Sequence, residues 1–387
     1  MRRDINNLLY EGSGFFRQKL ILSTLTGRPI QFVEIRPLDD RPGLRDCEVR
    51  FLRLLDEITN GSVIDISRTG TELFYQPGLL QGGRFVFECG TERCVTYFLE
   101  ALICFAPFVK NAFDATLCGA VSNCPNDLAI DVIQHAWLPV LNKFASNYSA
   151  PELELKILKR GLKPDGGAEI LFHAPSARQL SPVQLTTPGR VHKIRGIAYV
   201  CKVSPLLATR MVNTAKTMLK RLLGDIYVHI DQRKGVASGN SPGYGLMLAA
   251  HTTEGTVYTS HACSNPVGDE PKVPEDVGHE SAKLLCDEIY RGGCVDSTAQ
   301  SLLCCFMALG QKDVSTVVVG PLSNYTVAFL RTINDMTGVS FKIESIRGNS
   351  NQEAGNSNSE QVLSFGSEKV KLTCVGAGFT NLNKVLL

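Results

Sequence analysis

The sequence has almost no charge imbalance, a single tryptophan and no long apolar run. Its 387 residues carry 40 Lys and Arg against 38 Asp and Glu, which leaves a formal net charge of +2. Such a balance gives no global basic field to attract nucleic acid, so any contact with RNA must come from a local cluster. Residues 1–30 contain no uninterrupted apolar stretch. We therefore expect neither a secretory signal nor a membrane span.

The short motifs that hold nucleotides or metals are also missing. No Gly-x-x-x-x-Gly-Lys-Ser/Thr sequence occurs, and Gly12-Ser13-Gly14 lacks the third glycine of a dinucleotide-binding loop. The 13 cysteines and 7 histidines include no two pairs at zinc-site spacing. An odd number of cysteines at irregular intervals is typical of a reducing compartment, where most act as small core residues. We predict no metal and no cofactor.

What the chain does contain is a recurring order of elements: helix, strand, helix and two strands. Hydrophobic periodicity predicts a helix at residues 14–26, a strand at 30–36 and a helix at 44–58, followed by two strands. The same order returns within residues 95–173 and again within residues 297–375. Because no sequence identity links the three copies, the repeat rests on the pattern of elements.

An additional segment separates the second copy from the third. The corresponding strands begin near residues 30, 113 and 315, so the second interval is longer by about one small domain. The extra segment follows a proline-rich stretch and contains its own strands and helix. We predict an α/β (α+β) fold with the first two repeats in residues 1–184, an inserted small α/β domain in residues 185–292 and the third repeat in residues 293–387.

Two segments leave their placement open. A helix predicted at residues 277–290 fits either side of the second domain boundary. Residues 349–361 are rich in Asn, Ser and Glu, a composition typical of disordered loops. We interpret them as a variable surface insertion.

Arginines near the N terminus are candidate anion contacts. Five lie close together in the sequence: Arg17, Arg28, Arg36, Arg41 and Arg45. Guanidinium groups on the first helix and at the ends of the first strand can converge on a phosphate. They can equally pair with the nearby Asp39, Asp40 and Asp46, and the sequence leaves both interpretations open.

A glycine pair provides a second candidate. Gly166-Gly167 precedes a predicted strand, with Arg160 and Lys163 just upstream. Such a pair can expose backbone N–H groups to a phosphate, although a tight turn explains the same residues. We keep the glycine pair and Arg160 as candidates for anion binding.

A set of motifs is distributed along nearly the whole chain. The N-terminal block consists of Gly12, Phe16-Arg17, Leu22 to Pro29, Ile35-Arg36, Arg41 to Leu44 and Asn60 to Ser62. Later motifs are Lys159 to Gly161, Gly166-Gly167, Val203 to Pro205, Ser241 to Gly243 and Gly376 to Asn381. Together they resemble the RNA 3′-terminal phosphate cyclase family. The resemblance implies three repeated units, each with two helices on a four-stranded sheet, and a smaller inserted α/β domain.

The resemblance also implies that catalysis is lost. Active members of the family use ATP and a divalent metal to adenylate a histidine, which passes AMP to an RNA 3′-phosphate before a cyclic phosphate forms. Thr298 stands where that histidine should be, and no histidine follows His279. Other active-site positions of the enzymes are changed as well, to Tyr10, Gly14, Cys47-Glu48 and Ala168. These changes resemble a non-catalytic branch of the family, so we expect no enzyme activity.

That branch implies a function in ribosome assembly. We expect a monomer in the nucleus and nucleolus that acts in early processing of the small-subunit rRNA precursor. The resemblance implies a ribosome-assembly GTPase, pre-rRNA and a small nucleolar ribonucleoprotein particle as partners, with no membrane and no requirement for ATP. The candidate anion and RNA contacts are Arg17, Arg36, Arg41, Arg160, Gly166 and Gly167, with Thr298 at the lost nucleophile position.

Two enzymatic alternatives remain. The protein itself could cut the precursor RNA, since metal-assisted cleavage uses clustered carboxylates and Asp39-Asp40 beside Arg41 is one local cluster. Adjacent residues point in different directions on regular elements, so a solvated turn explains this pair more simply. Residual cyclase activity would need Thr298 or Lys312 to accept AMP in place of an imidazole.

Overall fold

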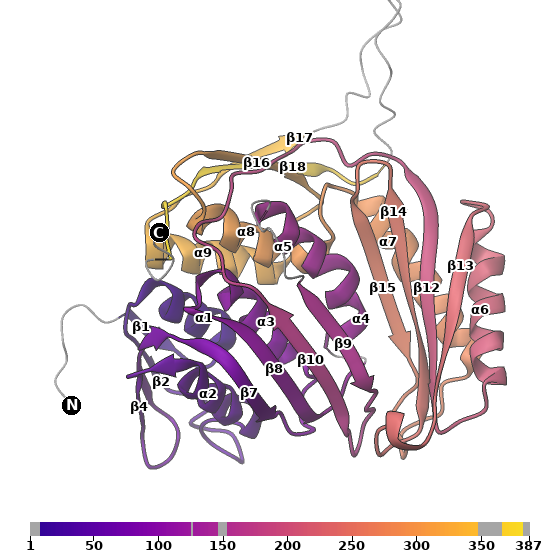
Figure 1. The fold of residues 1–387 in the computed structure, drawn as a ribbon, viewed down its shortest axis with the longest axis horizontal. Helices are drawn as coiled ribbons and strands as arrows, with labels where there is room; N and C mark the ends of the chain where they lie inside the picture. Colours follow the sequence, from indigo (N-terminus) through magenta and orange to yellow (C-terminus); the bar gives the residue numbers. More distant parts are fainter. Residues whose placement is uncertain (1–7, 125–126, 146–152, 347–365, 382–387) are drawn as a thin grey trace, which may run out of the picture.

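The computed structural model describes residues 8–124, 127–145, 153–346 and 366–381 (Figure 1). Its strands form four four-stranded sheets and one small sheet, so the predicted mixed α/β class is confirmed. The small sheet consists of β3 (Thr59–Asn60) and β6 (Leu79–Leu80). Residues 349–361, expected to be a disordered insertion, lie outside the described residues. No helix in the described ranges is long and apolar enough to cross a membrane.

Three of the sheets share one strand order, in which the first two strands run parallel and the others antiparallel. The first sheet contains, in spatial order, β1 (Leu8–Glu11), β2 (Ile30–Val33), β5 (Leu73–Gln76) and β4 (Val63–Ile66). The second contains β7 (Gly82–Glu88), β8 (Asn111–Ala120), β10 (Ala168–Ala174) and β9 (Glu154–Lys159). The third contains β11 (Gln184–Leu185), β16 (Val314–Val319), β18 (Lys369–Val375) and β17 (Lys342–Ile346). We call each of these sheets, with the helices that connect its strands, a unit.

Each unit has four strands, one more than the three that the sequence pattern predicted. The structure adds β1, β7 and β11, each parallel to its neighbour. β1 has four residues and β11 has two. In segments this short, the alternation of apolar and polar residues cannot be detected. β11 pairs with Thr316 and Val317 of β16. The third sheet therefore takes strands from both sides of the inserted segment.

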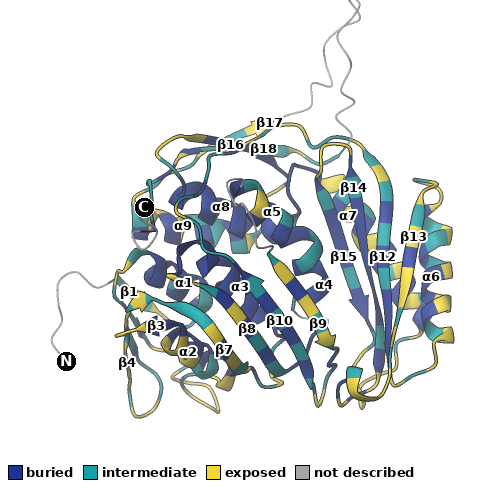
Figure 2. Ribbon diagram, viewed as in Figure 1, coloured by how far each residue is buried: buried dark blue, intermediate teal, exposed yellow. Residues whose placement is uncertain are grey.

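The helices of the three units pack against one another and share one hydrophobic core. They are α1 (Phe16–Thr26), α2 (Asp46–Ile58), α3 (Thr96–Phe105) followed by η1 (Ala106–Phe108), α4 (Ile130–Val132), the π-helical turn η2 (Ile133–Trp137), α5 (Leu138–Phe144), α8 (Gln300–Leu309) and α9 (Asn324–Thr337). Every residue of α3 and of α8 is buried (Figure 2). A helix buried on all sides must be surrounded by other elements, and α3 packs against both α1 and α8.

The inserted sheet has a core of its own. It is formed by β13 (Ile226–Arg233), β12 (Val191–Cys201), β14 (Gly243–Thr252) and β15 (Val257–Cys263), with a short turn η3 (Gly235–Ala237) before β14. Two helices pack against it, α6 (Leu206–Leu219) and α7 (Pro274–Arg291). The helix predicted at residues 277–290, which fitted either side of the domain boundary, corresponds to α7. It belongs with the inserted sheet, because α7 contacts β14, β15 and α6 (Figure 1).

Candidate functional site

A pocket of about 450 Å³ opens where the three units meet. Its walls are formed by Arg17 of the first unit, by Arg93, Glu100, Asp127, Leu128 and Trp137 of the second, and by Ser297, Thr298, Ser323 and Tyr325 of the third. We call it the three-unit pocket. Its size is within the ordinary range for binding sites of small organic groups.

Four helices begin at or near the three-unit pocket. Arg17 is the second residue of α1, and Arg93 lies shortly before α3. Thr298 lies in the turn η4 (Ser297–Ala299), which leads into α8, and Ser323 is the N-cap of α9. The N-terminal end of a helix carries a partial positive charge. The convergence of these ends favours a negatively charged or electron-rich group in the pocket.

The Arg17 guanidinium is held by partners from the second and third units. Nη2 donates to Glu100 Oε2 at 2.5 Å and to the Tyr325 hydroxyl at 3.0 Å, and Nη1 donates to the Tyr97 carbonyl at 3.0 Å. Burial alone would lower the pKa of Arg17, but the Glu100 carboxylate raises this pKa above its ordinary value. Burial in turn raises the pKa of Glu100, against the opposing charge of Arg17. Through Glu100 and Tyr325, Arg17 joins the three units at the pocket.

A second arginine–carboxylate pair lines the same pocket. Arg93 Nε donates to both carboxylate oxygens of Asp127 at 2.9 Å, and its Nη2 also donates to Oδ1. Burial alone would raise the pKa of Asp127, but hydrogen bonds from Arg93 and from the backbone of Cys94 lower it. The guanidinium carbons of Arg17 and Arg93 lie 4.5 Å and 4.8 Å from the centroid of the Tyr97 ring. One aromatic ring therefore supports both cations.

Two buried donors of pocket residues have no hydrogen-bond partner among the described residues: Nε of Arg17 and Nε1 of Trp137. A buried donor that is left unsatisfied costs about 1–3 kcal/mol, so such groups are uncommon away from binding sites. Trp137 is a core residue that also forms part of the pocket wall. It ends the π-helical turn η2, an irregularity that is frequent at functional sites.

Thr298, at the position that the resemblance assigns to the enzymes' histidine, is bonded within the protein. Its hydroxyl donates to Asp296 Oδ1 at 2.5 Å, and the hydroxyl of Thr259 donates to Oδ2 at 2.9 Å. The adjacent Ser297 donates its N–H and hydroxyl to Glu288 at 2.6 Å and 2.8 Å. Burial, and then the charge of Asp296, raise the pKa of Glu288 to about 7. The two carboxylates thus anchor the turn η4.

The structure places two of the predicted arginines away from this pocket. Arg36 Nη1 donates to Ser13 Oγ at 2.6 Å and Nε donates to the Gly43 carbonyl at 3.0 Å, while Nη2 pairs with Glu48. Arg36 therefore fixes the loop between β2 and α2. Arg41 is exposed in that loop. Neither arginine is among the residues that line the three-unit pocket, and their role as anion contacts stays a prediction.

Arg160 has a structural role at the junction with the inserted sheet. Its Nη1 and Nη2 donate to Asp131 at 2.8 Å and 2.7 Å, and its Nε donates to Asp231 at 2.8 Å. The side chain is 2% exposed. Burial alone would raise the pKa of Asp131, but Arg160 lowers it to about 2. Because these carboxylates occupy the guanidinium, the geometry disfavours the candidate role of Arg160 in anion binding.

The glycine pair forms the tight turn that the sequence left as an alternative. Gly166 and Gly167 have φ angles of 59° and 84°, which favour glycine. The N–H of Gly166 donates to the Leu162 carbonyl at 2.9 Å, and that of Gly167 donates to the Gly119 carbonyl at 3.4 Å. With both N–H groups bonded inside the protein, the geometry favours a turn over a phosphate cradle.

The pocket residues missed in the sequence include four with charged or phenolic side chains: Arg93, Glu100, Asp127 and Tyr325. One signal was available, because Arg93 lies near the start of the first helix in its unit, as Arg17 does in the first unit. The other residues gave no signal. Glu100 lies 83 positions from Arg17, Tyr325 lies 308 positions from it, and Asp127 lies 34 positions from Arg93.

The two carboxylates on which the nuclease alternative depends, Asp39 and Asp40, do not line the three-unit pocket. Asp39 and Asp40 are exposed in the loop after β2. Among the described residues, one group of three His, Cys, Asp or Glu side chains is close enough to share a metal ion, and it consists of Cys94, Cys124 and Asp127. Asp39 and Asp40 are not part of it, so the described residues provide no cluster of that kind for metal-assisted cleavage there.

The fold and the pocket define a class: a mixed α/β protein with repeated four-stranded sheets and a binding pocket where three units meet. The family model of RNA 3′-terminal phosphate cyclase matches residues 8–343, and the chain belongs to this family. The RNA 3′-terminal phosphate cyclase-like proteins of Mus musculus and Homo sapiens are 49% and 48% identical to it over 100% of each chain. The rRNA processing protein rcl1 of Schizosaccharomyces pombe is 38% identical over 97% of each chain. The predicted resemblance to the cyclase-like branch is confirmed.

Proposed function

We propose that this protein is a non-catalytic factor in rRNA processing, which holds precursor RNA at the three-unit pocket without modifying it. The observation that carries this proposal is the balance of charge in the pocket. Arg17 and Arg93 are each bonded to a carboxylate, Glu100 and Asp127 respectively. The names of the relatives, cyclase-like proteins and an rRNA processing protein, support the same assignment.

The balance of charge argues against an adenylating enzyme. A nucleoside triphosphate carries several negative charges, which nucleotide-binding sites offset with free cations and a metal ion. The ionised groups that line this pocket cancel, and neither arginine is free of a carboxylate. At the position of the enzymes' histidine, Thr298 offers a hydroxyl, which is a weak nucleophile at its ordinary pKa. Both features support a pocket that does not carry out adenylation.

An RNA segment suits the pocket better. Its sugar hydroxyls, base edges and single phosphate groups accept hydrogen bonds while adding little charge. The unsatisfied donors of Arg17 and Trp137 and the hydroxyl of Tyr325 are of matching chemistry. Arg17 is the one residue of the predicted anion contacts that lines the pocket, and we retain it as a contact to RNA.

The more detailed part of the proposed function follows from the family resemblance. The protein acts in early processing of the small-subunit rRNA precursor in the nucleolus, as a monomer docked on a ribosome-assembly GTPase, beside a small nucleolar ribonucleoprotein particle. It is divided at residues 1–184, 185–292 and 293–387, and the separate core of the inserted sheet supports the middle part. Because β11 (Gln184–Leu185) belongs to the third sheet, the insertion begins after this strand.

The test is depletion of the protein in cells, followed by mapping of the ends of precursor rRNA. We expect small-subunit precursors to accumulate, and wild-type protein to restore processing. The variant Arg17→Ala/Glu100→Ala removes both members of one buried pair and leaves no unpaired charge, and we expect it to fail. The matched control Arg53→Ala/Glu57→Ala alters exposed residues of α2 and is expected to rescue.

Other outcomes would contradict the proposal in distinct ways. Normal precursor levels after depletion would exclude a role in rRNA processing. Failure of a folded Asp39→Ala/Asp40→Ala variant would favour the nuclease alternative. A covalent adenylate after incubation of the protein with α-labelled ATP would show that the protein is an active enzyme.

A further inference from the structure

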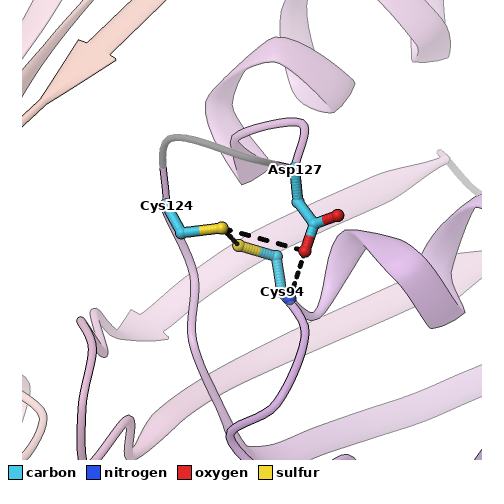
Figure 3. A group of neighbouring side chains, drawn as sticks. All are labelled: Cys94, Cys124 and Asp127. Carbon is cyan, nitrogen blue, oxygen red and sulfur yellow. Dashed lines mark hydrogen bonds between the residues drawn. The ribbon is translucent and has the colours of Figure 1, made fainter. Parts of the chain in front are cut away.

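All thirteen cysteines lie in the described ranges, where no disulfide joins them, and eleven are buried, which confirms the expectation of core thiols. Cys94 and Cys124 differ from simple packing residues because their sulfur atoms are in direct contact. Cys94 Sγ donates to Cys124 Sγ at 3.0 Å (Figure 3). The two residues are 30 positions apart in the sequence, so no short motif indicates the pair.

Asp127 holds the two cysteine-bearing loops together. Its Oδ2 accepts the backbone N–H of Cys94 at 2.9 Å and lies 3.8 Å from the thiol of Cys124, which donates to it (Figure 3). Cys94 also forms a parallel bridge with Val121, shortly before Cys124. The sulfur contact is therefore fixed by backbone interactions on both sides.

The geometry fits a bond between the sulfurs better than a shared metal. The ligand atoms of Cys94, Cys124 and Asp127 lie within 4.8 Å of one another. Two thiolates on one tetrahedral zinc ion, at about 2.3 Å each, would be about 3.7 Å apart, which is wider than the observed 3.0 Å. Both oxygens of Asp127 are bonded to Arg93, whose positive charge repels a cation.

A small cavity of about 10 Å³ borders Cys124, which is itself 2% exposed. Cys124 lines a small cavity together with Lys163, Pro242 and Ser264, whereas Cys94 is 0% exposed and is not among the lining residues. Burial raises the pKa of Cys94 well above its ordinary value. An oxidant therefore meets Cys124 first, with Cys94 behind it.

We propose that Cys94 and Cys124 form a reversible disulfide when the protein meets hydrogen peroxide. The Cys124 thiol gives its proton to one peroxide oxygen while its sulfur attacks the other, the O–O bond breaks, and a sulfenic acid and one water result. Cys94 loses its proton to the departing oxygen and attacks the Cys124 sulfur; the S–O bond breaks and a second water leaves. Two thiols lose two electrons in total, and one peroxide is reduced to two waters.

The disulfide would fix one wall of the three-unit pocket. Arg93 precedes Cys94, and Asp127 follows Cys124 by three positions; both line the pocket. A covalent link across 30 positions also restricts the unfolded chain. We expect oxidation to raise the melting temperature by a few degrees.

The chain provides an internal control in a second thiol contact. An interaction with the Cys104 side chain, together with burial, raises the pKa of Cys305 well above its ordinary value, and the two residues are buried in α3 and α8. Neither lines the three-unit pocket or the small cavity. This second pair borders neither of these two cavities, and we expect it to resist peroxide as long as the protein is folded.

The test is peroxide titration of the reduced full-length protein, alkylation of the remaining thiols with N-ethylmaleimide, and peptide mapping by mass spectrometry. We expect a peptide pair linked through Cys94 and Cys124 to appear first and to disappear on reduction with dithiothreitol. Cys94→Ser should leave a sulfenic acid on Cys124 that dimedone traps, and Cys124→Ser should leave Cys94 as a thiol. Cys104→Ala should leave the linked pair unchanged.

The peptide mapping uses wild-type protein, so it still tests the proposal if one of the variants fails to fold. A first bond between Cys104 and Cys305 would overturn the proposal. So would Cys94 and Cys124 that remain thiols until the protein unfolds. One equivalent of zinc in the purified protein that protects both thiols from alkylation would identify a metal site instead.

Discussion

Arg160 and Asp231 join two parts of the chain that fold around different cores. Arg160 directly follows β9 of the second unit, and Asp231 lies in β13 of the inserted sheet; Nε and Oδ2 are 2.8 Å apart. Asp131 accepts two further hydrogen bonds from the same guanidinium, which lies 4.7 Å from the centroid of the Tyr199 ring. The inserted sheet is therefore fixed against the second unit by one buried cation with two anions.

Replacing this cation should destabilise the fold. Arg160→Met leaves the fully buried Asp131 without a counter-charge, and loss of one partner of a buried pair costs about 3–5 kcal/mol of unfolding free energy. Arg195→Met, which removes an exposed pair with Asp225, should cost less than about 1 kcal/mol. Urea denaturation measures both. Reduced RNA affinity of Arg160→Met at unchanged stability would instead support its candidate role in anion binding.

The acidic pair behind Thr298 should make stability depend on pH. Burial raises the folded-state pKa of Glu288 to about 7, above the unfolded value of about 4.3. The folded state therefore binds the proton more tightly, so this stabilisation is complete below about pH 4 and is lost as the pH rises through 7. Glu288→Gln should lessen the fall in unfolding free energy between pH 5 and pH 8.

The matched control for this pH dependence is Glu57→Gln, which alters an exposed carboxylate of α2. Its unfolding free energy should follow that of wild type across the same range. A wild-type curve that rises from pH 5 to pH 8 by as much as the Glu288→Gln curve would show that Glu288 titrates near its ordinary pKa.

Restoring the family's histidine should not restore adenylation. In Thr298→His the imidazole would stand in a pocket whose arginines are still bonded to Glu100 and Asp127, so a triphosphate would remain unmatched in charge. Incubation with α-labelled ATP and gel autoradiography should show no labelled protein, with an active cyclase of the family as the positive control. Label on the variant would mean that the pocket does bind ATP.

Trp137 should report directly on occupation of the pocket. It is the single tryptophan of the chain and lines the three-unit pocket, so a bound group will change its fluorescence. Titration with a short 3′-phosphorylated RNA should shift or quench the emission in a saturable manner, and Arg93→Ala should weaken this response. Binding seen by fluorescence anisotropy of labelled RNA, with unchanged Trp137 emission, would place the RNA contact elsewhere.

We expect substitution of Gly166 to lower the unfolding free energy of the protein. A Cβ atom there would lie 2.8 Å from the Gly119 carbonyl oxygen and 2.9 Å from that of Ala120, at a φ of +59°. Gly255 has a φ of +75° with nothing within 4 Å of its Cβ position. Gly255→Ala should cost about 1–2 kcal/mol, and Gly166→Ala more, because overpacking adds about 1–3 kcal/mol. Equal losses in urea denaturation would contradict this account.

Much of the fold followed from local pattern. The helix predicted at 44–58 is α2 (Asp46–Ile58), and the strand predicted at 30–36 begins at Ile30 of β2. Such elements span several turns or alternations, so their periodicity is detectable. β1 and β11 were missed because they are short, and they exist through parallel pairing with strands that follow a helix or a whole inserted segment.

The sequence by itself determined the family and the mixed α/β class. These rest on residue identity and local periodicity, which do not depend on how the units pack. Only the tertiary structure decided that Glu100 and Asp127 neutralise the two arginines, that Arg160 serves the inserted sheet, and that Cys94 meets Cys124. Each of these contacts joins residues about thirty or more positions apart, and the distance between such residues is set by packing of the units.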